Sequence, residues 1–187
     1  MNRWLRQLPN LVSSIRMVLV VPIAVALAHH RILTTLWLFG VAGASDALDG
    51  FLAKRFGWQT ELGGILDPLA DKLMLATGFV MLWLLRLVPL WLTATVIARD
   101  CIIVLGAVSY RILLGPIKAK PSRVSKFNTL AQVTFILVVL GTQQFSWPPE
   151  WALSLGALVF VTVVVSGIDY VLVYARQAAN YAGPNAA

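Results

Sequence analysis

The sequence is poor in charge and contains a single cysteine. Charged side chains make up 12% of the 187 residues, about half the share found in a typical soluble domain, and 59% of the residues are hydrophobic. Cys101 has no second cysteine, which excludes an internal disulfide and a cysteine metal cluster, and we expect it to be a small buried residue in a helix. Internal repeats, low-complexity tracts and sustained heptads are also absent. The composition predicts one compact membrane domain over residues 1–187.

The net charge of +7 could indicate a nucleic-acid partner. The basic residues are spread over the connections between apolar stretches, however, as expected for cytoplasmic loops and for contact with anionic lipid headgroups. We therefore expect membrane lipid, and no nucleic acid, around this chain.

Six apolar stretches are long enough to cross a bilayer, which takes about 20 residues each. They cover residues 11–29, 32–53, 64–86, 89–114, 125–145 and 151–174. Before the first of them, Trp4, Leu5 and Leu8 lie on one side of a short basic segment, which predicts an interfacial helix ended by Pro9 and Asn10. The expected fold is an all-α integral membrane protein with six transmembrane helices and a short N-terminal interfacial helix.

Four of the eight acidic residues stand close together, where the second apolar stretch ends and the third begins. They are Asp46, Asp49, Asp67 and Asp71. A carboxylate near the centre of a bilayer costs at least ~2.5 kcal/mol, so four of them require a compensating cation. On a helix, spacings of three and four place each pair on one face, about 5–6 Å apart. Hard oxygen ligands suit Mg²⁺, Mn²⁺ or Ca²⁺, and charge balance favours two divalent cations.

The distribution of basic residues predicts the orientation in the membrane. With the N-terminus inside, nine basic residues of the connections fall on the cytoplasmic side and two on the other, a strong positive-inside asymmetry. The cytoplasmic residues are Arg3, Arg6, Lys54, Arg55, Lys118, Lys120, Arg123, Lys126 and Arg176, and the external ones are Arg31 and Arg86. The N-terminus and the aspartates are then cytoplasmic, and we expect the inner membrane of a bacterium.

Small and basic residues accompany the aspartates. Gly50, Ala53 and Gly63 leave room for a bulky ligand against the helix backbones. Lys54 and Arg55 supply positive charge where a phosphate would approach. Because two-metal sites clamp both oxygens of a displacement at phosphorus, the pattern predicts a metal-bound diphosphate at the membrane surface.

A different class of function, a cation or proton transporter, would also place acids within spans. The aspartates cluster at one face, and Asp100 and Asp169 are the only other acids expected inside the membrane. An acidic ladder across the bilayer is therefore missing, which favours an enzyme.

The aspartate segment resembles the signature of the CDP-alcohol phosphotransferase (phosphatidyltransferase) family. That signature reads D-x-x-D-G-x-x-A-R, then eight or nine residues, then G-x-x-x-D-x-x-x-D. Seven fixed positions match over 26 residues, with eight residues in the gap. The matching residues are Asp46, Asp49, Gly50, Ala53, Gly63, Asp67 and Asp71. One position departs, because Lys54 stands where the family has arginine, with Arg55 immediately after it.

The resemblance implies a homodimeric membrane enzyme that transfers a phospho-alcohol unit from a CDP-alcohol to a second alcohol and releases CMP. It implies that the four aspartates hold two divalent ions, Mg²⁺ or Mn²⁺, and that Asp71 is the base that activates the acceptor hydroxyl. It also implies a donor site for the CDP group, made by Asp49, Gly50, Ala53, Lys54 and Gly63.

Three further strings resemble particular branches of the family. Residues 67–72 are similar to members that make anionic glycerophospholipids from CDP-diacylglycerol. Residues 99–104 and 120–129 resemble the eukaryote-type cardiolipin synthase, in which phosphatidylglycerol is the acceptor. The alternative is a phosphatidylglycerophosphate synthase, with glycerol 3-phosphate as the acceptor.

Three basic residues outside the signature are candidates for binding the acceptor: Arg99, Arg123 and Lys126. Arg99 lies in mid-span, where an unpaired guanidinium is costly, and its alternative is a pair with Asp100 or Asp169. Arg123 and Lys126 could also serve only the positive-inside asymmetry. Arg16, inside the first stretch, is expected to snorkel towards the cytoplasmic surface.

Overall fold

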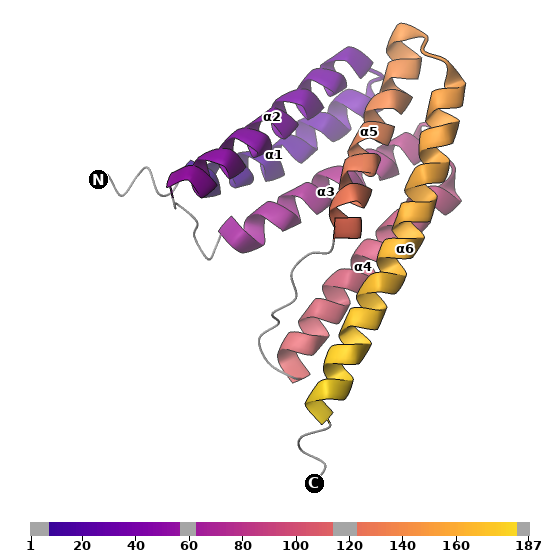
Figure 1. The fold of residues 1–187 in the computed structure, drawn as a ribbon. Coiled ribbons are helices and arrows are strands. Elements are labelled where there is room, and N and C mark those ends of the chain that lie inside the picture. The colour runs from indigo at the N-terminus through magenta and orange to yellow at the C-terminus, as the bar shows by residue number, and fades with distance from the viewer. Residues whose placement is uncertain (1–7, 57–62, 114–122, 183–187) are drawn as a thin grey trace. The chain divides into compact units, whose positions relative to one another are not determined.

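The computed structural model describes the backbone of residues 8–56, 63–113 and 123–182, and the side chains of residues 14–45, 69–106, 108–109 and 124–173. This part of the chain forms six helices and contains no strand (Figure 1). The helices are α1 (Leu8–Ala28), α2 (Ile32–Phe56), α3 (Gly63–Leu84), α4 (Leu90–Leu113), α5 (Arg123–Phe145) and α6 (Pro149–Ala182). The all-α prediction is confirmed, and each helix coincides with one predicted apolar stretch.

Among the residues whose side chains are described, two segments are long and apolar enough, by length and composition, to cross a membrane: Val124–Phe145 and Pro149–Val173. Two shorter apolar segments, Ser14–Ala28 and Ile32–Ser45, lie in α1 and α2. Six spans and a single domain over residues 1–187 stay predictions. Residues 1–7 of the expected interfacial helix lie outside the described residues. The break expected at Pro9 and Asn10 is wrong, because α1 is helical from Leu8 through both residues, and proline is tolerated in the first turn of a helix.

Helices α1 and α3 end in the same hydrogen-bonded turn. The amide of His30 donates to the carbonyl of Leu27, and the next amide donates to Ala26, both at 2.9 Å. Arg86 and the residue after it repeat this pattern at the end of α3, at 2.8 and 2.9 Å. His30 and Arg86 have φ of 53° and 60°, the left-handed conformation that glycine usually supplies at this position. The turn after α1 lets the chain reverse into α2 within a few residues (Figure 1).

The chain divides into two compact units, Met1–Val88 with Leu140–Ser146, and Pro89–Val139 with Trp147–Ala187. In the first unit α1 packs against both α2 and α3. Its core contains Ile23 and Leu27 of α1 and Phe79 and Leu82 of α3, all with 0% exposure. Because α2 and α3 both pack on α1, the two helices that carry the four aspartates belong to one packed unit.

In the second unit α4 packs against α6, and α5 joins them through side-chain contacts. A Cβ at Gly156 of α6 would lie 3.2 Å from the ring of Phe135 on α5 and 3.8 Å from Leu92 on α4. Trp91 stacks edge-on against Phe160, with ring centroids 5.4 Å apart. The absence of a side chain at Gly156 is what lets these helices approach closely at that depth.

Large apolar side chains are exposed on every helix, among them Val18, Trp37, Leu73, Leu105 and Leu130. Soluble monomers rarely expose apolar patches of this extent, and such a surface is suited to contact with lipid. Cys101 is exposed as well, which corrects the expectation that it is buried. The buried stripe of α4 runs through Leu92, Val96 and Ile103, and Cys101 lies off that stripe.

Candidate active site

The four aspartates lie on two helices, as their spacing predicted. Asp46 and Asp49 belong to α2, and Asp67 and Asp71 belong to α3. Helical backbone at these positions puts the members of each pair on one face, about 5–6 Å apart. Of the four side chains, that of Asp71 is described. The side chains of Asp46, Asp49 and Asp67 lie outside the described set. The same holds for the other matching positions and the departing one: Gly50, Ala53, Lys54 and Gly63.

Asp71 forms an ion pair with Arg16 of α1. Nη1 of Arg16 donates a hydrogen bond to Oδ1 of Asp71. The arginine side chain is 1% exposed, whereas the aspartate side chain is 37% exposed. A buried guanidinium therefore holds a carboxylate that is itself partly exposed.

The expectation that Arg16 snorkels to the surface is wrong. Arg16 lies seven residues before Ile23 and eleven before Leu27, on the same buried stripe of α1. That stripe faces α3, so the guanidinium meets a carboxylate inside the helix contact and does not reach water. The sequence signal was available, because Arg16 shares a helical face with apolar core positions.

The chemistry of the aspartates fits a divalent cation. Carboxylate oxygens are the hard ligands that Mg²⁺ and Mn²⁺ prefer. A carboxylate has two oxygens with about four lone-pair positions, so a partner at Oδ1 of Asp71 does not exclude a cation as a further partner. Among the side chains that the structure describes, no three acidic, histidine or cysteine residues stand together. Asp46, Asp49 and Asp67 lie outside that set, so the metal site stays a prediction.

Arg99 is the centre of a polar cluster in the second unit. Its Nη1 donates to Oδ1 of Asp100 at 2.6 Å, and its Nη2 donates to the hydroxyl of Ser125 on α5 at 2.9 Å and to that of Ser166 on α6. The guanidinium also lies 5.7 Å from the ring centre of Tyr170, within range of a cation–π contact. The pairing with Asp100, one of the two alternatives from the sequence, is confirmed.

Further buried polar groups extend this cluster along the same helices. The hydroxyl of Thr162 donates to Oδ1 of Asn128 at 3.0 Å, and Gln132 lies one turn further along α5. The side-chain nitrogens of Asn128 and Gln132, and Nε of Arg99, are buried without a hydrogen-bond partner. Sequence reasoning did not single out these two amides. The signal that could have identified them is their spacing of four residues, which places both amides on one face of an otherwise apolar helix.

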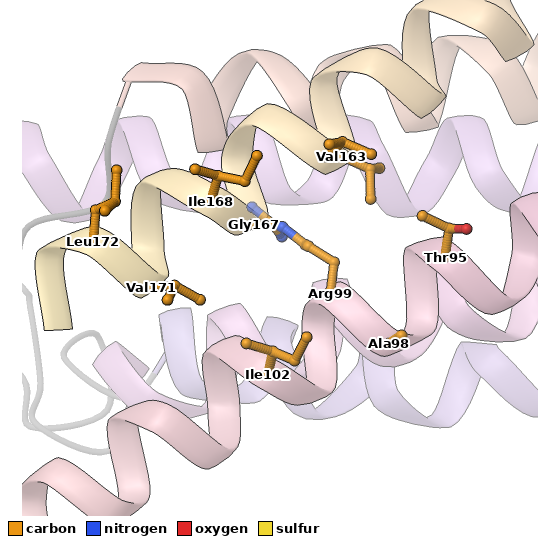
Figure 2. A pocket seen from close by; sticks show the side chains of 10 residues that line it. Thr95, Ala98, Arg99, Ile102, Val163, Gly167, Ile168, Val171 and Leu172 are labelled. Atoms are coloured by element: carbon orange, nitrogen blue, oxygen red, sulfur yellow. The ribbon is translucent and has the colours of Figure 1, made fainter. Parts of the chain in front are cut away.

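A cavity of about 480 Å³ adjoins Arg99 between α4 and α6. Figure 2 shows the arginine reaching from α4 towards α6 among side chains that are otherwise almost all apolar. The walls of the cavity include Ile102 of α4 and Val163, Ile168 and Leu172 of α6. Of the other predicted acceptor ligands, Lys126 is exposed on α5, and the side chain of Arg123 lies outside the described set. The structure thus brings Arg99 to a ligand-sized, mainly apolar cavity.

Comparison with known protein families shows to which family the chain belongs. The sequence profile of the family described as CDP-alcohol phosphatidyltransferase matches residues 6–177, which is most of the chain. The chain belongs to the CDP-alcohol phosphatidyltransferase family. The resemblance drawn from the aspartate signature is confirmed.

Named relatives fall into the two predicted branches of the CDP-alcohol phosphatidyltransferases. The rat protein named cardiolipin synthase (CMP-forming) is 31% identical over 162 residues, covering 78% of this chain and 53% of the rat protein. The Mycobacterium tuberculosis H37Rv protein named probable phosphatidylglycerophosphate synthase is 29% identical over 177 residues, covering 88% of this chain and 79% of its own length. A rice chloroplastic protein named CDP-diacylglycerol--glycerol-3-phosphate 3-phosphatidyltransferase 1 is 31% identical over 186 residues, covering 89% of this chain and 56% of its own length. The chain thus spans about half the length of the rat and rice relatives.

Proposed function

We propose that this protein is a CDP-diacylglycerol-dependent phosphatidyltransferase of anionic glycerophospholipid synthesis that releases CMP. The observation that carries the proposal is the aspartate signature on α2 and α3, two helices that pack on α1. Family membership and the names of relatives in both branches support the same reaction class.

In the proposed site Asp46, Asp49, Asp67 and Asp71 would hold two divalent ions, Mg²⁺ or Mn²⁺. Such ions, when bound, neutralise charge on a diphosphate and on a departing phosphate. Lys54 would contact a donor phosphate in place of the family arginine. Gly50, Ala53 and Gly63 would leave space beside the helices for the CDP group.

The reaction is an in-line displacement at the phosphorus that carries the diacylglycerol. The bond between this phosphorus and the acceptor oxygen forms as its bond to the CMP oxygen breaks. Asp71 accepts the proton of the acceptor hydroxyl. A carboxylate beside cations is a weak base, so its main task is to orient the hydroxyl, and the proton moves late in the step.

The first-choice acceptor is phosphatidylglycerol. Arg99 lies at a mainly apolar cavity, and its Nη groups already bind Asp100, Ser125 and Ser166. A small, doubly charged acceptor such as glycerol 3-phosphate needs a concentrated basic pocket, whereas a lipid needs apolar surface and modest positive charge. Glycerol 3-phosphate is the alternative acceptor, and relatives named for it make it a necessary comparison. Arg123 and Lys126 are proposed as further contacts to the acceptor's phosphate.

The proposed setting is a bacterial inner membrane crossed by six helices, with the N-terminus and the aspartates at the cytoplasmic face. The exposed apolar side chains on each helix and the distribution of basic residues support this arrangement. A homodimer is proposed from the family resemblance.

Product identification tests the choice of acceptor. Purified protein receives CDP-diacylglycerol and Mn²⁺ with either phosphatidylglycerol or glycerol 3-phosphate, and the lipid product is identified by mass spectrometry. We expect cardiolipin in the reaction with phosphatidylglycerol and no product in the reaction with glycerol 3-phosphate. If the protein instead makes phosphatidylglycerophosphate from glycerol 3-phosphate and no cardiolipin, the acceptor is glycerol 3-phosphate and the proposed reaction class still holds.

A further inference from the structure

The side of α1 that faces α3 carries one buried charged residue, Arg16. It is 1% exposed and lies on a stripe with Ile23 and Leu27, both at 0%. A buried guanidinium is tolerated when it is paired, and here the carboxylate of Asp71 is one such partner. Because the arginine side chain is packed on all sides, its guanidinium donates to Oδ1 of Asp71 from one fixed position.

From this geometry we infer that Arg16 is a positioning residue for Asp71, a role that rests on the proposed function. Arg16 holds Oδ1 of Asp71, whose side chain is 37% exposed, and so restricts the orientation in which this carboxylate meets a divalent cation and the acceptor hydroxyl. Carboxylates that bind metals are commonly oriented by a hydrogen-bonding neighbour behind them, and loss of that neighbour weakens metal binding or activity about 10–100-fold.

Simple electrostatics makes the opposite prediction for cation binding. A positive charge beside a metal ligand repels the metal, so removal of Arg16 by charge alone would strengthen cation affinity. Orientation and charge therefore change the affinity in opposite directions. The measured direction separates the two effects.

Two variants isolate orientation from charge. Arg16→Lys keeps the positive charge but replaces the planar fork by a flexible point charge. Arg16→Gln removes the charge and keeps a short hydrogen-bond donor. Arg99→Lys is the matched control, because Arg99 is also a buried arginine paired with an aspartate, 6% exposed, and lies in the other unit.

The experiment is a titration of detergent-solubilised protein with Mn²⁺, followed by electron paramagnetic resonance of the unbound ion, without nucleotide or lipid substrate. Arg16→Lys and Arg16→Gln are expected to bind Mn²⁺ about 10-fold or more weakly, and Arg99→Lys is expected to bind it as the unaltered protein does. In steady-state assays, Arg16→Lys is expected to lower kcat and to leave the KM for CDP-diacylglycerol unchanged.

Unchanged or tighter Mn²⁺ binding by Arg16→Lys, in a protein that elutes as a folded species, would overturn the positioning role and leave the proposed transferase intact. An equal loss in Arg99→Lys would overturn it too, because the effect would then be general to buried arginines. If the unaltered protein binds no Mn²⁺, the proposed metal site itself fails, and the positioning role fails with it.

Discussion

Arg99 of α4 donates a hydrogen bond through Nη2 to the hydroxyl of Ser166 on α6, between two side chains that are 6% and 0% exposed. The same nitrogen binds Ser125 of α5, so one guanidinium links three helices. In an apolar surround such a link is costly to break, because a buried polar group left without a partner loses its solvation.

The Arg99 cluster predicts a graded loss of stability. Ser166→Ala removes one hydrogen bond to a charged group and should cost about 1.5–3 kcal/mol. Arg99→Leu removes the bonds to Ser125 and Ser166 together with the partly buried ion pair to Asp100, and should cost more, about 3–5 kcal/mol. Equilibrium unfolding in mixed detergent micelles measures both. Equal stability of Arg99→Leu and the unaltered protein would contradict the tie between helices.

The aspartate signature predicts loss of turnover without loss of folding. Asn in place of Asp46, Asp49, Asp67 or Asp71 should abolish CMP release, because each change removes a charged oxygen ligand. Asp71→Asn also takes the carboxylate partner from buried Arg16, so this variant should in addition be less stable than the other three. EDTA should act in the same way on the unaltered protein, and added Mn²⁺ or Mg²⁺ should restore activity. Size-exclusion profiles serve as the folding control. Robust activity of Asp71→Asn would remove Asp71 from the role of base.

Lys54 is predicted to bind a donor phosphate as a point charge. Lys54→Arg should keep or improve the affinity for CDP-diacylglycerol, because arginine offers a two-pronged fork. Lys54→Ala should weaken it by about 1.5–3 kcal/mol, typical of a hydrogen bond to a charged group. Donor KM values measure both effects. If Arg55→Ala causes the loss and Lys54→Ala has no effect, the register of the signature at this position is wrong.

Gly156 is predicted to be required for close packing in the second unit. A side chain there meets Phe135 at 3.2 Å, so Gly156→Leu should overpack the helix contact and cost about 1–3 kcal/mol. Gly40 of α2 is the control, because a Cβ there meets nothing within 4 Å. Gly40→Leu should be neutral or stabilising, since leucine favours the helix more than glycine does. Thermal unfolding of the two variants provides the comparison, and similar melting temperatures would count against the packing role.

Helix positions and the candidate site were largely accessible from the sequence. Apolar stretches of about 20 residues located α1 to α6, because length and hydropathy are local properties. The aspartate spacing placed Asp46 and Asp49 on one helix and Asp67 and Asp71 on the next, because a helical period of 3.6 depends on sequence alone.

Pairings between helices were not accessible in the same way. Nothing local shows that Arg16 meets Asp71, 55 residues further along the chain, since that contact depends on how α1 packs on α3. Arg99 was expected to bind the acceptor, yet its bonds to Ser125 and Ser166 depend on the facing sides of α5 and α6. Faces of helices that are apolar all round are poorly distinguished by sequence, which also explains why Cys101 was assigned to the interior.

The central claim, transfer from CDP-diacylglycerol, is tested most directly by CMP release from purified protein in vesicles. The vesicles contain CDP-diacylglycerol and phosphatidylglycerol, with Mn²⁺ supplied outside, and CMP is quantified against the donor consumed. We predict one CMP for each donor consumed, none after EDTA and none with Asp71→Asn. Absence of CMP with phosphatidylglycerol and with glycerol 3-phosphate, together with Mn²⁺ or proton flux into the vesicles, would contradict the transferase and favour a transporter.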